Sequence, residues 1–158
     1  MFREMRRKKQ LLSNEECIEI LKSCATGIVA VNGDDGYPYT VPLNYVYEDG
    51  KILFHCAKEG HKMDAIMKDD KVSFCVIELD KVVPEDFATD YRSVVAFGRA
   101  RVLTEDHERR AVLEKLIDKY SAGYEEEGQK EIENDWNIVA LVEIRIEHMT
   151  GKKSLSLV

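Results

Sequence analysis

The sequence predicts a single α+β domain built on antiparallel strands. Three observations support this: segments with a two-residue hydrophobic period, tight-turn residues between them, and stretches with helical spacing in the gaps. The pattern contains about six strands, and closing them into a barrel would remove the exposed edges of the sheet. With 158 residues, the chain has the length of one domain that folds without disulfides or a structural metal.

The N-terminal half begins with a helix and continues with short strands. Ser13 and Glu16 match a capping box. Residues 32–36 tolerate left-handed dihedral angles, as a hairpin turn requires. Pro38 and Pro42 each remove a backbone donor, so part of the returning strand should be an edge or a bulged segment. The expected elements are a helix over 14–25, strands over 28–31, 37–47 and 51–57, and a helix after Gly60.

The C-terminal half predicts longer strands around one more helix. Residues 79–90 contain Pro84 and several acidic residues, which favours a loop. Gly98 suggests a bulge or a close approach of two backbones. Thr104, followed by two acidic residues, is expected to cap a helix. The expected elements are strands over 71–78 and 91–103, a helix with Leu113, Leu116, Ile117 and Tyr120 on one face, a polar connection over 121–135, and a half-buried strand from Ile138.

Composition and charge exclude several classes of protein. No apolar run reaches the roughly 20 residues that cross a bilayer, and a formal net charge of −7 opposes nucleic acid as a partner. Residues 1–12 form a basic arm, expected to be solvated or to lie on a partner subunit, and residues 13–158 form one domain. Because no apolar stretch of a signal peptide follows the arm, we expect a cytoplasmic protein.

The chain offers no familiar metal site or catalytic motif. Its four cysteines include no C-x-x-C pair, so zinc is not expected and the thiols should be small buried side chains in a reducing compartment. His55 and His61 are separated by a strand end and a loop, which is no known ligand spacing. Serine-hydrolase, zinc-protease and P-loop motifs are absent. We therefore assign no catalytic residue and no metal.

The segment from Phe54 to Lys62 has the pattern of an anion site. A strand leads through Gly60 to a helix whose first turn carries His61 and Lys62. Backbone N–H groups at a helix start have no partner within the helix and lie at the positive end of its dipole. A phosphate placed there would be held by the amides and by Lys62. The alternative is an ordinary exposed turn, although a lysine in a first turn is mildly unfavourable without an anion.

Two further segments have the residue types of a ligand site. Pro38–Tyr45 is a strand stiffened by prolines, whose free backbone groups could meet a flat polar heterocycle; it could equally pack on another subunit. Ser93 offers a hydroxyl, and Arg92 or Arg99 a guanidinium, to a phosphate. The alternative for these three residues is a plain strand with solvated arginines.

Taken in order, these segments resemble the pyridoxamine-5′-phosphate-oxidase-like FMN-binding split-barrel family, and within it the nitroimidazole-resistance-type branch. The resemblance extends over most of residues 13–150. The matching segments are Thr26–Val31, Gly36–Val46, Phe54–Lys62, Lys71–Phe74, Ser93–Val94 and Gly98–Ala100.

The resemblance implies a six-stranded antiparallel split β-barrel with flanking helices, and a homodimer with FMN at the subunit interface. It also implies which residues bind the cofactor. Strand residues 41–44 would lie against the isoalloxazine ring with His55 and Ala57 beside it, and His61, Lys62 and Ser93 would surround the phosphate. The full set of cofactor-binding residues is Val41, Pro42, Leu43, Asn44, His55, Ala57, His61, Lys62, Ser93 and Val94.

One departure from the family narrows the expected function. The vitamin B6 oxidases carry a C-terminal Arg-x-His, and the segment Ile144–His148 has the wrong spacing, so pyridoxamine phosphate is not the expected substrate. We expect an FMN-dependent oxidoreductase that passes electrons from a reduced nicotinamide to a small oxidised molecule such as a nitroaromatic. Tyr45, Lys58 and Trp136 are expected at the substrate mouth, although Trp136 could instead be a core residue.

A non-catalytic protein is the alternative. The same barrel could store or sense flavin, or hold haem with His55 or His61 as axial ligand.

Overall fold

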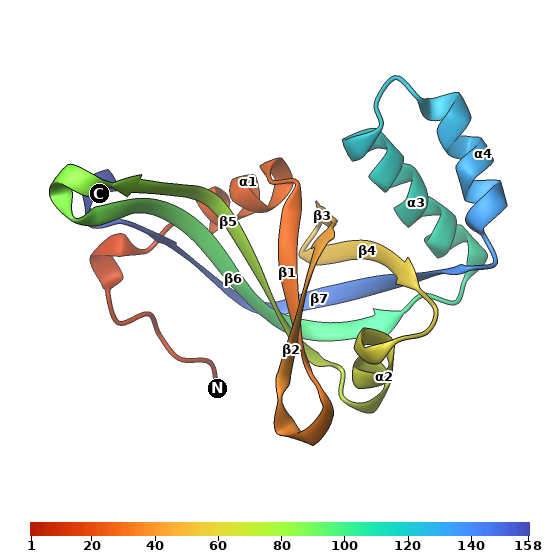
Figure 1. Cartoon of the computed structure of the whole chain (residues 1–158), viewed down its shortest axis with the longest axis horizontal. Coiled ribbons are helices and arrows are strands. Elements are labelled where there is room, and N and C mark those ends of the chain that lie inside the picture. The colour runs from red at the N-terminus through yellow and green to blue at the C-terminus, as the bar shows by residue number, and fades with distance from the viewer.

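The structure, a computed structural model, describes all 158 residues as one curled antiparallel sheet with helices packed against it (Figure 1). The sheet is open, and its seven strands follow the order β2-β1-β5-β6-β7-β4-β3, so β2 and β3 are its edges. The strands are β1 (Thr26–Asn32), β2 (Pro38–Asn44), β3 (Val46–Glu48), β4 (Lys51–Ala57), β5 (Lys71–Val83), β6 (Ala88–Val102) and β7 (Val139–Lys153). The helices are α1 (Asn14–Ser23), α2 (His61–Lys68), α3 (Asp106–Tyr120) and α4 (Glu125–Asp135).

The α+β class is confirmed, but the sheet has seven strands rather than six and is open rather than closed into a barrel. The strand expected over 37–47 is two strands, because the chain turns inward between Asn44 and Val46. Tyr45 lies at this corner with its ring fully buried, and its hydroxyl donates to the Leu21 carbonyl at 2.6 Å. The corner thus interrupts the strand at one residue, whose aromatic side chain is anchored in the core.

The loop expected over 79–90 is a β-hairpin instead. After a register shift between Ile77 and Leu79, β5 continues to Val83, and β6 begins at Ala88. Only the short turn Pro84–Phe87 connects them. The polar residues in this segment fit a strand because the hairpin projects from the rest of the sheet (Figure 1) and leaves both of its faces partly exposed.

A helix was missed, and one helix start was misplaced. The polar connection expected over 121–135 contains α4, whose first turn carries three glutamates, as the positive end of a helix dipole favours. Ile132 is buried and ties α4 to the domain. Helix α3 begins after Glu105, not Thr104, and no side chain caps it.

Several local predictions are confirmed. Ser13 and Glu16 form the full capping box of α1. Asp35 and Gly36 have positive φ in the first hairpin turn. Strand β2, with both prolines, is an edge strand. At Gly98 the register with β7 shifts, and a Cβ there would collide with the carbonyl oxygen of Arg145.

The main core lies between the strands and helices α1 and α2. Its largest fully buried side chains include Tyr45, Phe54 and Phe74, and the rings of Tyr45 and Phe74 meet edge to face at 4.9 Å. A second cluster under α3 contains Leu53 and Leu116. Strand β4 is therefore buried on both faces along its first half, which holds it firmly between the two clusters.

The basic side chains of the arm are exposed, whereas its last residues pack on the domain. Gln10 and Leu12 are buried, and the Gln10 side chain donates to the Lys153 carbonyl at 2.8 Å. Near the N-terminus, the Phe2 ring stacks on His148 with the ring centres 4.8 Å apart. The end of the arm is therefore part of the folded domain. None of the helices is long and apolar enough to span a membrane.

Candidate functional site

The sheet leaves two lengths of backbone without a neighbouring strand. Strand β2 pairs only with β1. Strand β4 pairs with β7 throughout, but β3 covers only Lys51–Leu53, so Phe54–Ala57 has a free side. Residues of both β2 and β4 line each of two hollows, so these free edges lie near each other across the opening of the sheet. Unpaired backbone N–H and C=O groups need hydrogen-bonding partners, which a flat polar ligand can supply.

The first hollow, called the α2 hollow, has a volume of about 150 Å³ and lies at the start of α2. Gly60 precedes the helix with φ +131°, a conformation that other residues rarely adopt, and open space lies above it. No side chain caps the helix, so the N–H groups of its first turn have no protein partner. The residues around the hollow are Tyr39, Val41, Ala57, Glu59, Gly60, His61, Lys62 and Met63.

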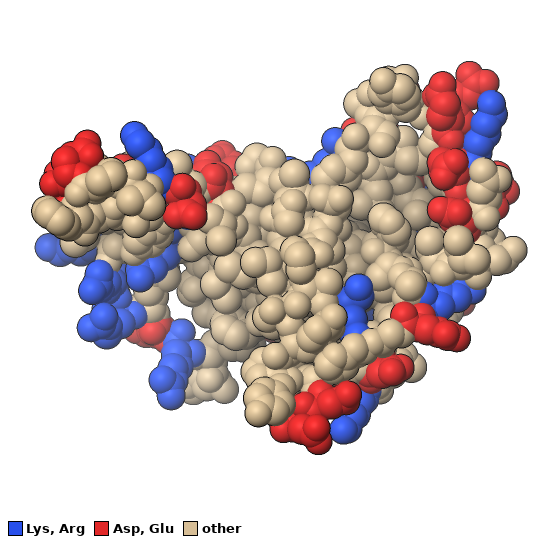
Figure 2. Space-filling view, in the orientation of Figure 1, with Lys and Arg blue, Asp and Glu red and all other residues tan.

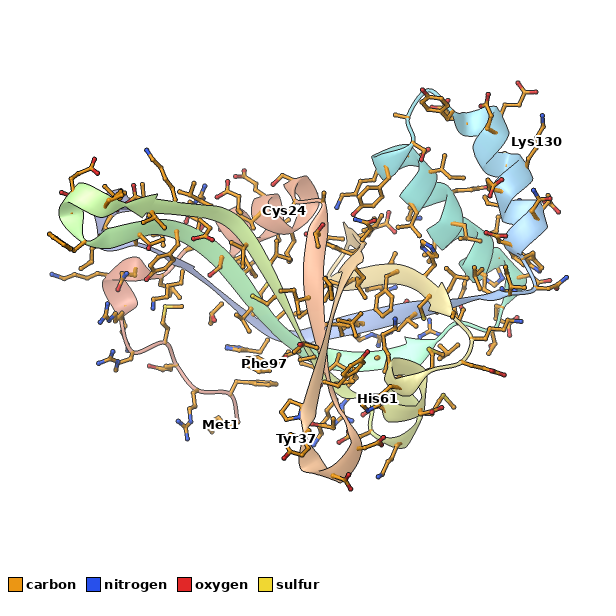
Figure 3. All side chains as sticks on the ribbon, in the orientation of Figure 1. Met1, Cys24, Tyr37, His61, Phe97 and Lys130 are labelled. Atoms are coloured by element: carbon orange, nitrogen blue, oxygen red, sulfur yellow. The ribbon has the colours of Figure 1, made fainter.

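His61 and Lys62, the first two residues of this turn, have different surroundings. His61 turns toward the β1–β2 hairpin (Figure 3), stacks on Tyr39 at 4.2 Å, and accepts the Asp34 N–H at Nε2 over 3.3 Å. Lys62 is half-buried and forms no ion pair; its Nζ lies 5.9 Å from the centre of the Phe54 ring. Lys62 is thus the cation that an anion in the α2 hollow would meet, whereas His61 is held by the hairpin.

The second hollow, called the α3–α4 hollow, has a volume of about 230 Å³ and lies between the two C-terminal helices and the ends of β2 and β4. Its floor is apolar, and its rim carries an amide, an imidazole, two hydroxyls and two carboxylates. The residues around it are Asn44, His55, Leu113, Leu116, Ile117, Tyr120, Ser121, Gly128, Glu131, Ile132, Asp135 and Val139.

The end of α3 fixes the corner after β2. The Tyr120 hydroxyl accepts the Tyr45 N–H at 2.9 Å and lies 2.6 Å from the Ala25 carbonyl oxygen, to which it donates. Lys119 donates to the carbonyls of Cys24 and Tyr45 at 2.7 and 2.9 Å. Burial lowers the pKa of Lys119 and raises the pKa of Tyr120. These contacts hold the wall of the α3–α4 hollow against the strand edge.

The structure brings most of the predicted cofactor residues to the opening of the sheet. Val41, Ala57, His61 and Lys62 line the α2 hollow, and Asn44 and His55 line the α3–α4 hollow. Pro42 and Leu43 lie between them on β2, Pro42 exposed and Leu43 half-buried. Eight of the ten predicted residues therefore lie on the free strand edges and at the start of α2.

The two predicted residues on β6 lie elsewhere. Ser93 pairs with Ile77 and Lys152. It lies six residues along β6 from Arg99, a distance of about 20 Å at the usual rise of a strand. Arg99 pairs with Lys71, just after the end of α2, so Ser93 and α2 are not brought together within one chain. Val94 offers no surface to a cofactor within one chain, because its side chain is 0% exposed and its backbone pairs with strands on both sides.

Of the three residues predicted at the substrate mouth, Tyr45 is wrong, and Lys58 and Trp136 lie outside both hollows. Tyr45 is a core residue, as described above, and cannot contact a substrate. The Trp136 ring lies outside both hollows and is covered by the guanidinium of Arg109 at 4.2 Å. Lys58 is exposed after β4 and lines neither hollow; its role at a substrate mouth stays a prediction.

Sequence reasoning missed the whole α4 wall of the α3–α4 hollow. The signal was present, since the residues that line this hollow from α4 have the spacing i, i+3, i+4, i+7, as do those from α3. On α4 they are Gly128, Glu131, Ile132 and Asp135; on α3 they are Leu113, Leu116, Ile117 and Tyr120. Because only one of the four α4 residues is a large apolar side chain, the periodicity was hidden.

The chain matches one protein family and the folds of several solved structures. A family described as pyridoxamine 5′-phosphate oxidase matches residues 13–153. No protein with a curated description matches the chain. Among solved structures, a conserved hypothetical protein from Mycobacterium tuberculosis has a TM-score of 0.83 at 22% identity, with 98% of this chain and 92% of that chain covered.

Two other solved structures have informative names. A protein from Bacteroides thetaiotaomicron named for 5-nitroimidazole antibiotic resistance has a TM-score of 0.73 at 20% identity, with 90% of this chain and 86% of that chain covered. A FAD-binding protein from Mesorhizobium loti has a TM-score of 0.65 at 25% identity, with 92% and 97% covered.

Proposed function

Since this chain belongs to the pyridoxamine 5′-phosphate oxidase family, we propose that it is an FMN-dependent oxidoreductase. Its electrons come from a reduced nicotinamide and pass to a small oxidised molecule, with nitroaromatics among the acceptors. The observation that carries the proposal is the start of α2, where uncapped N–H groups, a glycine with φ +131° and the unpaired Lys62 surround one hollow.

These residues suit the two ends of a flavin mononucleotide. The first-turn amides of α2 and Lys62 would hold the terminal phosphate through charge-assisted hydrogen bonds. The free edge of β2 from Val41 to Asn44, and His55 and Ala57 on β4, would lie along the ring. When bound, the flavin supplies hydride and electron transfer itself. The protein therefore has to bind, orient and shield it, and a catalytic dyad is not needed.

The proposed assembly is a homodimer with two cofactor sites. Each hollow is smaller than the roughly 300–1,000 Å³ of a usual ligand pocket, so one chain would enclose a flavin only in part. Figure 2 shows a broad area without charged side chains over the middle of the molecule, where β1 and β2 lie. The exposed rings of Tyr37 and Tyr39 belong to this hairpin. A second copy covering such a surface would complete the site and bring in its own Ser93.

The absorption spectrum of the purified protein tests the cofactor. We expect flavin bands, bleaching on anaerobic addition of NADH or NADPH, and catalytic reoxidation by a nitroarene or a quinone. Chromatography of the released flavin distinguishes FMN from FAD. A flavin that is never turned over with any acceptor would favour storage or sensing, and a Soret band would favour haem. A colourless protein that does not bind added FMN or FAD would contradict the proposal.

The molar mass in solution tests the assembly. Sedimentation equilibrium should give twice the mass of one 18.2 kDa chain. A monomer with bound, fully protected flavin would contradict the homodimer but not the flavin site.

A further inference from the structure

The α3–α4 hollow has the form of a small-molecule pocket beside the ring end of the proposed flavin site. Asn44 and His55 line it from the free strand edges, where the resemblance places the isoalloxazine. The helices add a floor of aliphatic side chains, among them the buried Leu116 and Ile132. Its volume of about 230 Å³ suits a single aromatic ring with one or two substituents. A ligand seated here would lie next to the cofactor ring without using any of the phosphate contacts.

The charges at the rim of this hollow are unbalanced. Glu131 and Asp135 both line it from α4, four residues apart, and neither forms an ion pair. Like charges at this spacing destabilise a helix slightly. A positive group in the hollow would relieve that repulsion, and a negative group would add to it.

The neighbouring cations do not neutralise the rim, because each has another partner. Arg110 pairs with Glu133 at 2.7 Å, and Lys115 pairs with Glu48 at 3.3 Å. Lys119 and Arg109 donate to backbone carbonyls. Lys130 lies on the outer side of α4, away from the strands (Figure 3).

We infer that the α3–α4 hollow is the binding pocket for the electron acceptor, and that it selects aromatic acceptors that are cationic or uncharged over anionic ones. This inference rests on the proposed function. For a nitroarene the reaction is ArNO2 + NADPH + H⁺ → ArNO + NADP⁺ + H2O. The nicotinamide is oxidised by loss of a hydride, one N–O bond of the nitro group breaks, and that oxygen leaves as water with the hydride hydrogen and a solvent proton.

Three nitrobenzenes that share one ring and differ in charge test the selectivity. They are 4-nitrobenzylamine, 4-nitrobenzyl alcohol and 4-nitrobenzoate, and their binding to the purified holoprotein is measured by isothermal titration calorimetry before any turnover. We expect the amine to bind about tenfold more tightly than the benzoate at low ionic strength, with the alcohol between them and the difference shrinking in salt. The ratios of kcat/KM under NADPH should follow the same order.

Variants on α4 identify the groups responsible. The double variant Glu131→Gln/Asp135→Asn should bring the amine and the benzoate to within about twofold of each other. Glu126→Gln is the control matched to each single variant, Glu131→Gln or Asp135→Asn. It removes one charge from the opposite side of the same helix and should leave the preference unchanged. If the control and the double variant lose the preference for the amine to the same extent, the net charge of the protein sets this preference, not Glu131 and Asp135. That result would overturn the inference.

A blocking variant tests the location independently of charge. Ser121→Phe places a ring at the edge of the hollow and should weaken binding of all three compounds at least about fivefold, while the flavin spectrum and FMN affinity stay as in the parent protein. Circular dichroism checks that the variant folds. If NADPH reduces the flavin and all three acceptors bind and react equally well in parent and variants, this inference fails and the proposed function stands. If no flavin binds or none is reduced, the proposed function fails first.

Discussion

The two hollows at the opening of the sheet are built in opposite ways. The α2 hollow depends on consecutive residues, since Gly60, His61 and Lys62 set the helix start, the free amides and the cation together. The α3–α4 hollow is assembled from the ends of β2 and β4 and from two helices that follow some 60 residues later in the chain. The first is a backbone site suited to one invariant group, a phosphate. The second is a side-chain site, in which substitutions can change the ligand without disturbing the fold.

The largest expected effect comes from removing the cation of the α2 hollow. Lys62→Ala should weaken FMN binding by about 1.5–3 kcal/mol, or about 10- to 150-fold, because a charge-assisted hydrogen bond to the phosphate is lost. Riboflavin, which has no phosphate, should bind as before. Fluorescence quenching on titration of each flavin measures both affinities.

Lys68→Ala is the control for this variant. Lys68 lies in the last turn of the same helix and lines neither hollow, so its loss should leave both flavin affinities unchanged. An FMN affinity that survives Lys62→Ala intact would move the phosphate away from α2.

A smaller effect is expected from the backbone of the same turn. In Gly60→Ala, a Cβ meets no neighbouring atom, so any cost arises from holding alanine at φ +131°. We expect a loss of about 1–3 kcal/mol in the free energy of unfolding, read from urea denaturation followed by circular dichroism. Gly36→Ala is the comparison, since φ +78° at Gly36 lies in a turn away from the amides of α2. Weaker FMN binding in Gly60→Ala alone would tie the helix start to the ligand as well as to the fold.

The contrast between a site built from consecutive residues and one assembled from distant segments also explains how much of the molecule can be predicted from the sequence. Asp35, Gly60 and Gly98 act through their own backbone conformation or that of a neighbour. The hairpin turn, the helix start and the bulge at these three positions were predicted correctly. Tyr45 was misassigned because its position beside Pro42 and Asn44 suggested a ligand rim. Its burial is decided by Leu21 and Phe74, which are distant in sequence.

Residues that cooperate over a distance were the hardest to assign. Ser93 and Lys62 were grouped by family pattern, and only the pairing register separates them along the sheet. Helix α4 was missed because its buried face has a single large apolar residue, Ile132. The polar residues of α4 line a hollow only because α3 packs beside the helix. Local hydrogen bonding can be read from one segment, whereas a side chain's surroundings depend on every segment that folds against it.

Loss of a hydrogen bond beside the α3–α4 hollow should lower the stability of the protein and leave its affinity for FMN unchanged. Tyr120→Phe removes the acceptor of the Tyr45 N–H and the donor to the Ala25 carbonyl. We expect about 1 kcal/mol less stability toward urea, with no change in FMN affinity. Tyr124→Phe, at an exposed ring nearby, should have no measurable effect. A drop in FMN affinity with Tyr120→Phe would show that the two hollows are coupled through β2.

The smallest expected effect is the response of the two hollows to salt. Lys62 is half-buried, so ions screen its attraction for a phosphate only partly, and FMN affinity should fall about two- to threefold between roughly 0.05 and 0.5 M sodium chloride. Riboflavin bound at the same strand edges, and 4-nitrobenzyl alcohol bound in the α3–α4 hollow, carry no charge and should show no such fall. Parallel titrations of the three ligands measure the difference. An equal salt dependence for FMN and riboflavin would mean that the phosphate is held by neither Lys62 nor the α2 amides. The α2 hollow would then not be the phosphate site, and its contrast with the α3–α4 hollow would no longer hold.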